Sequence, residues 1–354
     1  MKWVKGELLN EIDANSVDPT RQLDRSPHST LFTRKAWFAR VWKYLPTASM
    51  SPLIARVTSE GAIAWLFLVY EMPGKAKSLS NWYSFGFNVV YKGDPDDMQK
   101  RVMVTAMAKR LGSSRPALTT ITISPVVRDD GSTALLTSAF SRAKWKAFSS
   151  QVSTRWSANT QGKSFAEYWA ERPSQLRNTY RRKLNKAEFD VQIFDDFNES
   201  AWAEYEAVYE DSWKPEEGSP DFVRETAEYE GAAGCLRIGI CRVEGVAVAA
   251  QYWTVENGIA YIHKLAHRES ATSLSPGTIL SHALFAHVID QDAVSMIDFG
   301  TGNDAYKADW MDKSEPLDQI VFYNLKTVTG QWRATVATAK SFVRSRLNRN
   351  IVND

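Results

Sequence analysis

The chain has 354 residues and a mass of 39.9 kDa, a length that favours two domains over one. With 44% hydrophobic and 24% charged residues, its composition excludes a disordered chain. Basic residues number 43 and acidic residues 41, and the net charge of +2 argues against a protein that binds nucleic acid over its whole surface.

The termini and cysteines indicate a compartment. The sequence begins Met-Lys-Trp-Val-Lys-Gly-Glu, without the apolar core of a secretory signal. The longest apolar run, residues 62–70, is about half of the roughly 20 residues that a membrane helix needs. Cys235 and Cys241 would lie about 20 Å apart on one strand, whereas disulfide Cα atoms lie within about 7 Å. We therefore expect a cytoplasmic protein with reduced thiols and no membrane span.

The first half of the chain predicts an α/β unit. Three strands are expected over residues 53–57, 62–70 and 82–91. Glu60-Gly61 supplies the turn of a hairpin between the first two. A helix is expected to begin at Asp94-Pro95, where proline at the first helical position loses no hydrogen bond. Another strand follows over residues 118–123.

A helical connector is expected over about residues 163–190. Ser164-x-x-Glu167 is a capping box, and an apolar stripe predicts a second helix after Pro173. The other faces of that helix carry Arg177, Arg181, Arg182, Lys183 and Lys186. These cations either cover a solvated face or receive phosphates of a cofactor or an RNA backbone. A third helix is expected to place four aromatic side chains on one side: Trp202, Tyr205, Tyr209 and Trp213.

The second half repeats the order of elements found in the first. Strands are expected over residues 236–243, 246–255 and 259–265, a helix from Ser275-Pro276, and a strand over residues 294–299. Matching points lie about half a chain apart, which indicates a duplication of one α/β fold. The alternative is two unrelated α/β domains whose helices and strands have a similar order and spacing.

The two proline-started helices differ at their first residues. The first begins Asp94-Pro95-Asp96-Asp97, and the second begins Ser275-Pro276-Gly277-Thr278. A helix N-terminus offers free N–H groups and partial positive charge to a phosphate. Carboxylates would fill that position in the first helix, whereas glycine lets a ligand approach the backbone in the second. An ordinary serine cap is the other interpretation.

A glycine-containing loop is expected after the strand over residues 294–299. It runs from Asp298-Phe299-Gly300 to Tyr306-Lys307, where ligands of α/β sheets collect. A tyrosine here could protonate a leaving thiolate, and a lysine could pair with phosphate. The loop lacks a full dinucleotide fingerprint, and the chain has neither a Gly-x-Ser-x-Gly elbow nor a phosphate loop ending Gly-Lys-Ser/Thr. Hydrolase and nucleotidase functions are therefore disfavoured.

His263 and Lys264 lie just before the second proline-started helix, and alternation turns one of them inward. His263 is either a satisfied core histidine or a catalytic base. His282 and His287 are five residues apart, which is wrong for one helical face. No metal is therefore expected.

Five stretches together resemble the GNAT acyltransferase superfamily. Within that superfamily, they are most similar to the two-domain bacterial branch, which includes acetyltransferases linked to cellulose and exopolysaccharide synthesis. That branch is in turn similar to the Fem-type aminoacyltransferases. The stretches are Arg172-Pro173-Ser174-Gln175-Leu176-Arg177, Ser212-Trp213-Lys214, His263-Lys264-Leu265-Ala266-His267, Ser275-Pro276-Gly277-Thr278-Ile279-Leu280, and Asp298-Phe299-Gly300 through Tyr306-Lys307.

The resemblance implies an α/β fold of two tandem GNAT-like domains, each a central mixed β-sheet flanked by helices. Residues 1–160 would form a degenerate, structural domain and residues 161–354 the catalytic one. The implied reaction moves an acyl group, usually acetyl, from acetyl-CoA or another acyl-CoA to an amine or hydroxyl. The acceptor would be a small molecule or glycan precursor, such as a sugar, an amino acid or a cell-envelope or exopolysaccharide precursor.

The resemblance also implies roles for particular residues. Tyr306 would be the general acid, and Asp298 or His263 a base. The implied donor-binding residues are Ser275, Gly277, Thr278, Ile279 and Lys307, and the implied acceptor-binding residues are Lys264, Trp213 and Asp304.

One departure from the family pattern leaves the donor open. The usual phosphate loop, Gln/Arg-x-x-Gly-x-Gly/Ala, is replaced by the longer stretch from Arg268 to Gly277, which contains one glycine. Fem-type relatives use aminoacyl-tRNA, which the near-neutral charge weighs against and the basic connector supports. A non-catalytic GNAT-like scaffold in polysaccharide assembly is the remaining alternative.

Overall fold

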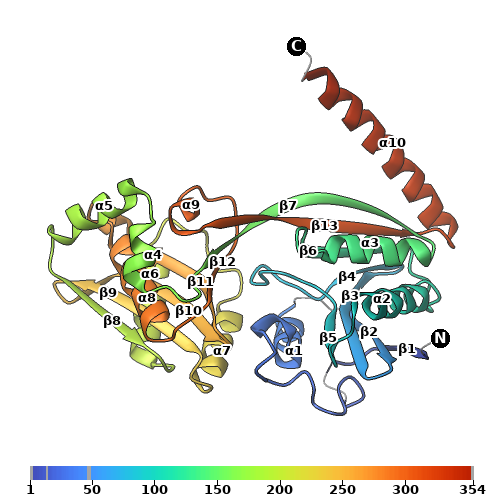
Figure 1. The fold of residues 1–354 in the computed structure, drawn as a ribbon, viewed down its shortest axis with the longest axis horizontal. Coiled ribbons are helices and arrows are strands. Elements are labelled where there is room, and N and C mark those ends of the chain that lie inside the picture. The colour runs from blue at the N-terminus through green and yellow to red at the C-terminus, as the bar shows by residue number, and fades with distance from the viewer. Residues whose placement is uncertain (1–2, 13–14, 46–48, 352–354) are drawn as a thin grey trace. The chain divides into compact units, whose positions relative to one another are not determined.

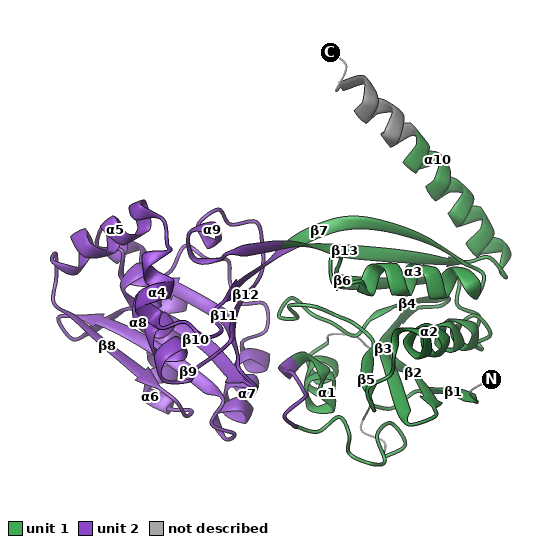
Figure 2. Ribbon diagram, in the orientation of Figure 1, with its two compact units in different colours: residues 1–25, 32–153, 315–354 green, residues 26–31, 154–314 purple. Residues whose placement is uncertain are grey.

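The computed structural model describes residues 3–12, 15–45 and 49–351, which form two compact units (Figures 1 and 2). Unit 1 comprises residues 1–25, 32–153 and 315–354, and unit 2 comprises residues 26–31 and 154–314. No helix among the described residues is both long enough and apolar enough to cross a membrane.

The helices and strands have the following bounds. Unit 1 contains β1 (Val4–Leu9), α1 (Lys35–Lys43), β2 (Ser51–Ser59), β3 (Ala62–Met72), β4 (Lys75–Ser78), β5 (Val90–Lys92), α2 (Asp97–Leu111), β6 (Thr120–Val127), α3 (Ser132–Arg142) and α10 (Val328–Ile351). Unit 2 contains α4 (Phe165–Ala170), α5 (Ser174–Leu184), β8 (Phe189–Phe194), α6 (Glu199–Glu210), α7 (Pro220–Gly231), β9 (Leu236–Val243), β10 (Val246–Glu256), β11 (Ile259–His267), α8 (Pro276–Asp290), β12 (Met296–Thr301) and α9 (Lys307–Trp310). The strands β7 (Trp145–Asn159) and β13 (Lys313–Asn324) contribute residues to both units.

Both units have the same strand order and the same pairing directions. Counted from the edge strand, the order in unit 1 is β1-β2-β3-β4-β6, and the order in unit 2 is β8-β9-β10-β11-β12. Neighbouring strands are antiparallel in each series except for the last pair, β4 with β6 and β11 with β12, which is parallel. A helix, α2 or α8, connects the members of each parallel pair, as a parallel connection requires. The predicted pair of mixed-sheet domains is therefore confirmed.

Each sheet continues with a strand that the repeat did not predict. The strand β6 pairs antiparallel with β13, from the C-terminal part of the chain, and β12 pairs antiparallel with β7, from the end of the first half. The compact units consequently do not follow the predicted boundary between residues 160 and 161, because residues 315–354 belong to unit 1. Backbone pairing across a long sequence separation decides this division, and no local pattern records it.

The prediction of a third strand over residues 82–91 is wrong. Only Val90–Lys92 forms a strand there, and the side chain of Trp82 is 86% exposed. The third strand is instead β4, which lies earlier in the chain and pairs with residues 68–72 of β3. The aromatic residues suggested a buried strand, but they line an irregular connection between β4 and β5.

The first proline-started helix begins later than predicted. Its first residue is Asp97, and the carboxylate of the N-cap Asp96 accepts a hydrogen bond from the Gln99 N–H at 2.6 Å. The expected filling of this helix start by a carboxylate is therefore present, whereas Pro95 lies outside the helix. Two apolar residues of this helix, Met98 and Val102, are exposed.

The helix α8 packs its apolar side chains on the sheet of unit 2. Ile279, Leu280, Leu284 and Val288 are buried there, as their spacing predicts. Gly239 lets the helix lie close to β9, since a Cβ at this position would stand only 2.8 Å from Cδ1 of Leu284. This packing fixes the position of the N-terminus of α8.

The remaining local predictions have mixed outcomes. The capping box at Ser164 and Glu167 is present at the start of α4. The helix α6 buries Trp202 and Tyr205 but ends at Glu210, so that Trp213 lies beyond it and is 48% exposed. Cys235 and Cys241 are both free thiols, Cys241 being buried.

Candidate functional site

The strands β11 and β12 separate soon after they begin to pair. Their parallel register covers Ile259, Ala260 and Tyr261 against Met296, Ile297 and Asp298. Beyond these three residues the strands diverge, and the rest of β11 does not pair with β12. Such a gap between parallel strands exposes main-chain groups and leaves room for a ligand.

A pocket of about 290 Å³ lies in unit 2 beside this divergence. Its lining comes from α5, the segment after α6, the end of β11, the start of α8, the end of β12, and α9 with the residue before it. The lining residues are Gln175, Leu176, Thr179, Trp213, Leu265, His267, Gly277, Thr278, Ser281, Phe299, Tyr306, Asp309 and Trp310. Apolar side chains with a few polar groups are typical of small-molecule sites. Elements far apart in the sequence thus build one pocket.

The N-terminus of α8 forms one wall of the pocket. Pro276 is the first helical residue, and Ser275 takes the left-handed conformation with φ 54° while its side chain does not cap the helix. A Cβ at Gly277 would meet Nδ1 of His267 at 3.5 Å, an ordinary contact distance. Ile279, by contrast, is buried in the core, so that only its main chain belongs to the helix start. The predicted donor-binding residues Ser275, Gly277 and Thr278 therefore lie together at an open helix end.

A basic side chain reaches the segment that leads into α8. The ammonium group of Lys183, on α5, donates a hydrogen bond to the main-chain oxygen of Ser273. The helix α5 also packs against α8. Of the cations predicted for the connector, Arg177, Arg181, Arg182 and Lys183 lie on α5, and Lys183 reaches the segment before the open end of α8.

Asp298 is buried rather than open to the pocket. Its side chain is fully buried and forms an ion pair with Arg155, whose Nη2 lies 2.6 Å from Oδ2. Its Oδ1 accepts a hydrogen bond from the Gly300 N–H at 2.9 Å. This carboxylate holds the start of the glycine loop, and we leave it out of the catalytic set proposed below.

Lys307 is also engaged within the loop. Its Nζ donates to the main-chain oxygens of Thr301 at 2.7 Å and of Phe299 at 3.3 Å, and it lies 3.7 Å from a carboxylate oxygen of Asp304. Burial lowers the pKa of Lys307, and the neighbouring carboxylates of Asp304 and Asp298 oppose that shift. The lysine closes the loop over residues 299–307 on itself, so its ammonium group points to main-chain oxygens.

Tyr306 lines the pocket next to this closed loop. Its ring packs edge-on against Phe299, with centroids 5.8 Å apart, and the residue is 38% exposed. Burial, followed by the charge of Asp304, raises the pKa of Tyr306 above its ordinary value. The phenol is consequently protonated at neutral pH, which is the form that a general acid requires.

His263 occupies a bulge on β11, between the residues that pair with Tyr252 and Trp253. Its Nε2 lies 2.8 Å from Oγ1 of Thr254, and its ring stacks on Tyr252 with centroids 4.8 Å apart. Burial, with the nearby charge of Lys264, lowers the pKa of His263 to about 3. The imidazole is neutral and hydrogen-bonded, as the core interpretation expects, and it does not line the pocket.

The predicted acceptor-binding residues are placed differently from one another. Trp213 lines the pocket, with its ring centroid 4.2 Å from that of His267. Lys264 forms a largely buried ion pair with Glu217, with Nζ 2.6 Å from the carboxylate oxygen. Asp304 has an exposed carboxylate beside Lys307. Only Trp213 is therefore part of the pocket wall itself.

The sequence interpretation missed two residues with a place in this site. Arg155 supplies the counter-charge of Asp298 from the neighbouring strand β7. Lys214 places its ammonium group 5.6 Å from the ring centroid of Trp213. Burial, together with repulsion from Lys264 and Lys307, lowers the pKa of Lys214 to about 8. Its position after Trp213 in the Ser212-Trp213-Lys214 stretch was the available signal.

Comparison with known proteins gives one family match and several similar folds. Residues 174–308 match the model described as an acetyltransferase (GNAT) domain. The crystal structure of FemX is similar with a TM-score of 0.60 at 12% identity, covering 89% of this chain and 96% of FemX. No curated protein matches in sequence.

Two further solved structures share the fold. A tandem GNAT protein from the clavulanic acid biosynthesis pathway has a TM-score of 0.52 at 11% identity, covering 90% of this chain and 98% of that one. The C-terminal domain of a putative lysylphosphatidylglycerol synthetase from Agrobacterium fabrum has a TM-score of 0.50 at 12% identity, covering 73% of this chain and 80% of that one. At these identities the likeness concerns the fold. Residues 174–308 therefore match a GNAT acetyltransferase domain, and the chain as a whole shares the fold of FemX and of the tandem GNAT protein.

Proposed function

We propose that the chain transfers an acyl group from acyl-CoA to an amine or hydroxyl, with the chemistry in unit 2 and a structural role for unit 1. One observation carries the proposal: a pocket beside the diverging strands β11 and β12 is bounded both by an uncapped helix N-terminus and by the phenol of Tyr306. These are an anion site and an acid within one pocket. The acceptor would be a sugar, an amino acid or an envelope or exopolysaccharide precursor.

The start of α8 would hold the phosphates of the donor. The open helix end offers partial positive charge, and Gly277 permits close approach of a phosphate oxygen to the main chain. Thr278 adds a hydroxyl group at the pocket wall. Ser275 and Lys183 of α5 lie beside this point. Lys307 is left out of this set because main-chain oxygens already occupy its ammonium group.

The thioester would lie in the gap between the strands. Beyond Tyr261, the N–H groups of β11 do not pair with β12, and one of them could polarise the thioester carbonyl. The acceptor nitrogen or oxygen attacks the carbonyl carbon, so that a C–N or C–O bond forms and the C–S bond breaks. The leaving thiolate takes the proton of Tyr306, the acceptor loses its proton to water, and solvent returns a proton to the tyrosine. Orientation of two bound substrates supplies much of the rate.

A calorimetric titration with CoA and acetyl-CoA tests this proposal. We expect saturable binding to the wild-type chain and its loss in Gly277→Asp, because a carboxylate there repels phosphate. Gly277→Ala is the matched control, since a Cβ at this position meets no clash. Absence of binding by a folded protein, or equal binding by Gly277→Asp, would contradict the proposal.

Aminoacyl-tRNA-dependent transfer is a second candidate, supported by the similarity to FemX and by the basic helix α5. A gel-shift titration with aminoacyl-tRNA separates it from the first. Binding of the RNA by a chain that does not bind CoA would favour the second candidate.

A further inference from the structure

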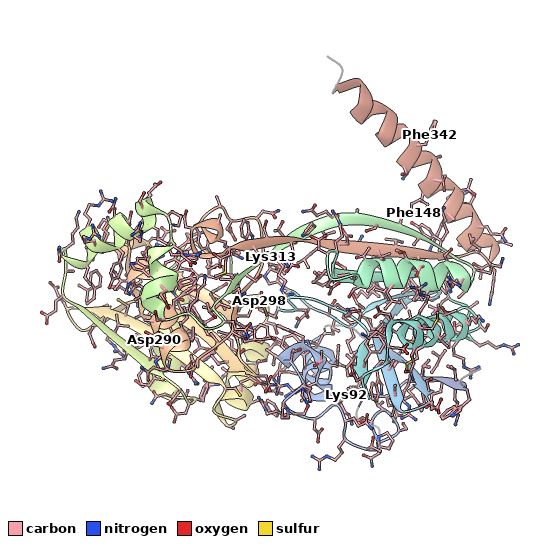
Figure 3. All side chains as sticks on the ribbon, in the orientation of Figure 1. Lys92, Phe148, Asp290, Asp298, Lys313 and Phe342 are labelled. Carbon is pink, nitrogen blue, oxygen red and sulfur yellow. The ribbon has the colours of Figure 1, made fainter. Side chains whose placement is uncertain are left out.

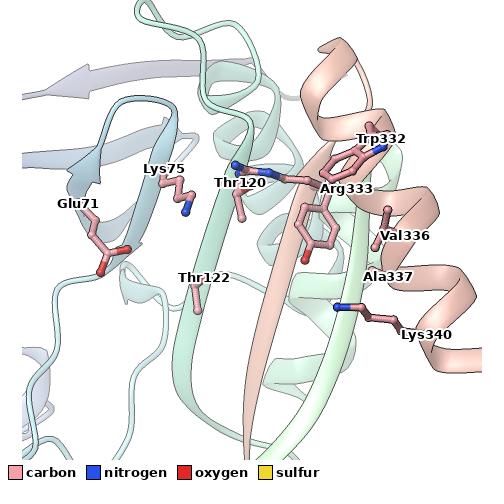
Figure 4. A pocket seen from close by; sticks show the side chains of 10 residues that line it. Glu71, Lys75, Thr120, Thr122, Trp332, Arg333, Val336, Ala337 and Lys340 are labelled. Atoms are coloured by element: carbon pink, nitrogen blue, oxygen red, sulfur yellow. Dashed lines mark hydrogen bonds between the residues drawn. The ribbon is translucent and has the colours of Figure 1, made fainter. Parts of the chain in front are cut away.

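A second pocket, of about 420 Å³, lies within unit 1 (Figure 4). One wall is the face of the sheet formed by β4, β6 and β13, and the other is α10. Alternation along the strands puts Lys75, Thr120 and Thr122 on this face, since Ala76, Ile121 and Ile123 are buried on the opposite one. The helical residues Arg333, Val336, Ala337 and Lys340 share one side of α10. The volume is within the range of small-molecule sites.

The charges around this pocket are unbalanced. Lys75, Arg333 and Lys340 line it, and no carboxylate among the described residues lies within ion-pairing distance of any of them. The lining acid, Glu71, is paired instead with Lys77, whose Nζ lies 3.1 Å away. Arg333 is held in position by its hydrogen bond to Oγ1 of Thr120, at 2.9 Å. Figure 4 shows Arg333 and Lys340 reaching from α10 toward the strands.

An aromatic surface adjoins these cations. Trp332 lines the pocket and is 66% exposed, so that most of its indole ring is in contact with solvent. An exposed indole next to cations can stack on the flat ring of a ligand whose other groups carry negative charge. Tyr323, from β13, contributes a second ring to the lining.

We propose that this pocket binds a nucleotide, with its phosphates against Lys75, Arg333 and Lys340 and its base on Trp332. The cations supply the charge-assisted hydrogen bonds that phosphates accept. The lining of this pocket belongs to unit 1, whereas the acyl transfer proposed above is assigned to unit 2.

Titration calorimetry with uridine diphosphate and with pyrophosphate tests the proposal, using the full chain that carries Gly277→Asp. That substitution is expected to abolish phosphate binding at the proposed CoA site. Binding of either probe to this variant therefore reports on the unit 1 pocket alone, and failure of this proposal can be distinguished from failure of the proposed function. We expect saturable binding of both probes. Lys75→Met should raise both dissociation constants by about tenfold, as loss of one charged hydrogen bond does. Trp332→Ala should weaken the binding of uridine diphosphate and leave that of pyrophosphate unchanged.

Lys326→Met is the matched control, because Lys326 is exposed just before α10 and outside the lining. It removes the same charge and should change either dissociation constant by less than about twofold. Circular dichroism establishes that each variant is folded. Absence of saturable binding, or equal effects of Lys75→Met and Lys326→Met, would overturn the site. An equal loss of both probes in Trp332→Ala would overturn the stacking of the base.

Discussion

Arg155 and Asp298 form an ion pair across neighbouring strands of unit 2, with Nε and Nη2 of the arginine 2.9 and 2.6 Å from Oδ2 of the buried aspartate. Asp298, which is labelled in Figure 3, belongs to β12. The other carboxylate oxygen accepts the N–H of Gly300. Gly300 has φ 66°, a conformation that glycine adopts readily. The pair therefore fixes the point at which the chain leaves β12 and enters the loop that leads to Tyr306.

The first prediction concerns this ion pair. Asp298→Asn should lower the free energy of unfolding by about 1–3 kcal/mol, because the fully buried side chain then loses its charge-assisted hydrogen bonds with the partly exposed guanidinium group of Arg155. Urea denaturation measures the change. Asp195→Asn, at an exposed position of unit 2, should change it by less than about 0.5 kcal/mol. Full stability combined with loss of transferase activity would instead make Asp298 a catalytic residue.

The second prediction concerns the proposed general acid. Tyr306→Phe retains the ring that packs on Phe299 and removes the hydroxyl group. We expect kcat to fall by about 10²–10⁴-fold, with little change in KM for acyl-CoA. Steady-state kinetics with the acceptor identified by screening measures both. Unchanged kcat, or an unaltered cellular role for both Tyr306→Phe and Gly277→Asp, would argue against catalysis at this pocket.

The third prediction uses the depressed pKa of Lys214. The folded protein binds the lysine proton only below about pH 8, whereas the unfolded chain holds it up to the ordinary value of 10.5. Stability therefore rises with pH between these values, and the cost of the buried charge is fully present below pH 8. Lys214→Met should be more stable than the wild type at pH 7, and this difference should shrink toward pH 10.5.

Urea unfolding of the wild type and Lys214→Met at pH 7 and pH 10 measures that difference. A difference that is independent of pH would show that the charge of Lys214 costs no stability. An anionic acceptor would offset the same charge, so Lys214→Met should also raise KM for such an acceptor.

The fourth prediction concerns the close packing of α8 on β9. Gly239→Ala places a methyl group 2.8 Å from Leu284 and should cost about 1–3 kcal/mol of stability. Gly218→Ala is the control, because no atom lies within 4 Å of a Cβ at that position. Thermal unfolding distinguishes them. Adding Leu284→Ala to Gly239→Ala should cost less than the sum of the two single changes, since the smaller side chain removes the contacts with Leu284 and leaves only the one with Cδ1 of Leu280, at 2.9 Å.

The sequence by itself determined the local elements and much of the pocket. The two hairpins, the capping box at Ser164 and the start of α8 at Pro276 follow from turn residues and periodicities within a few positions. Repetition of the strand order then indicated two related domains, which the strand pairing confirms. Gly277 and Tyr306 could be singled out because each belongs to a short pattern at an element boundary.

The tertiary structure decided which groups those elements bring together. The strand β7 pairs with β12, and β13 pairs with β6. Each pair joins strands that are distant in the sequence, so no local pattern predicts it. The sequence suggested Asp298 as a base and Lys307 as a donor-binding residue, and only the fold supplied Arg155 and the carbonyl of Thr301 as their partners. Propensity and periodicity act between residues near in sequence, whereas ion pairs and burial depend on which distant residues become neighbours in space.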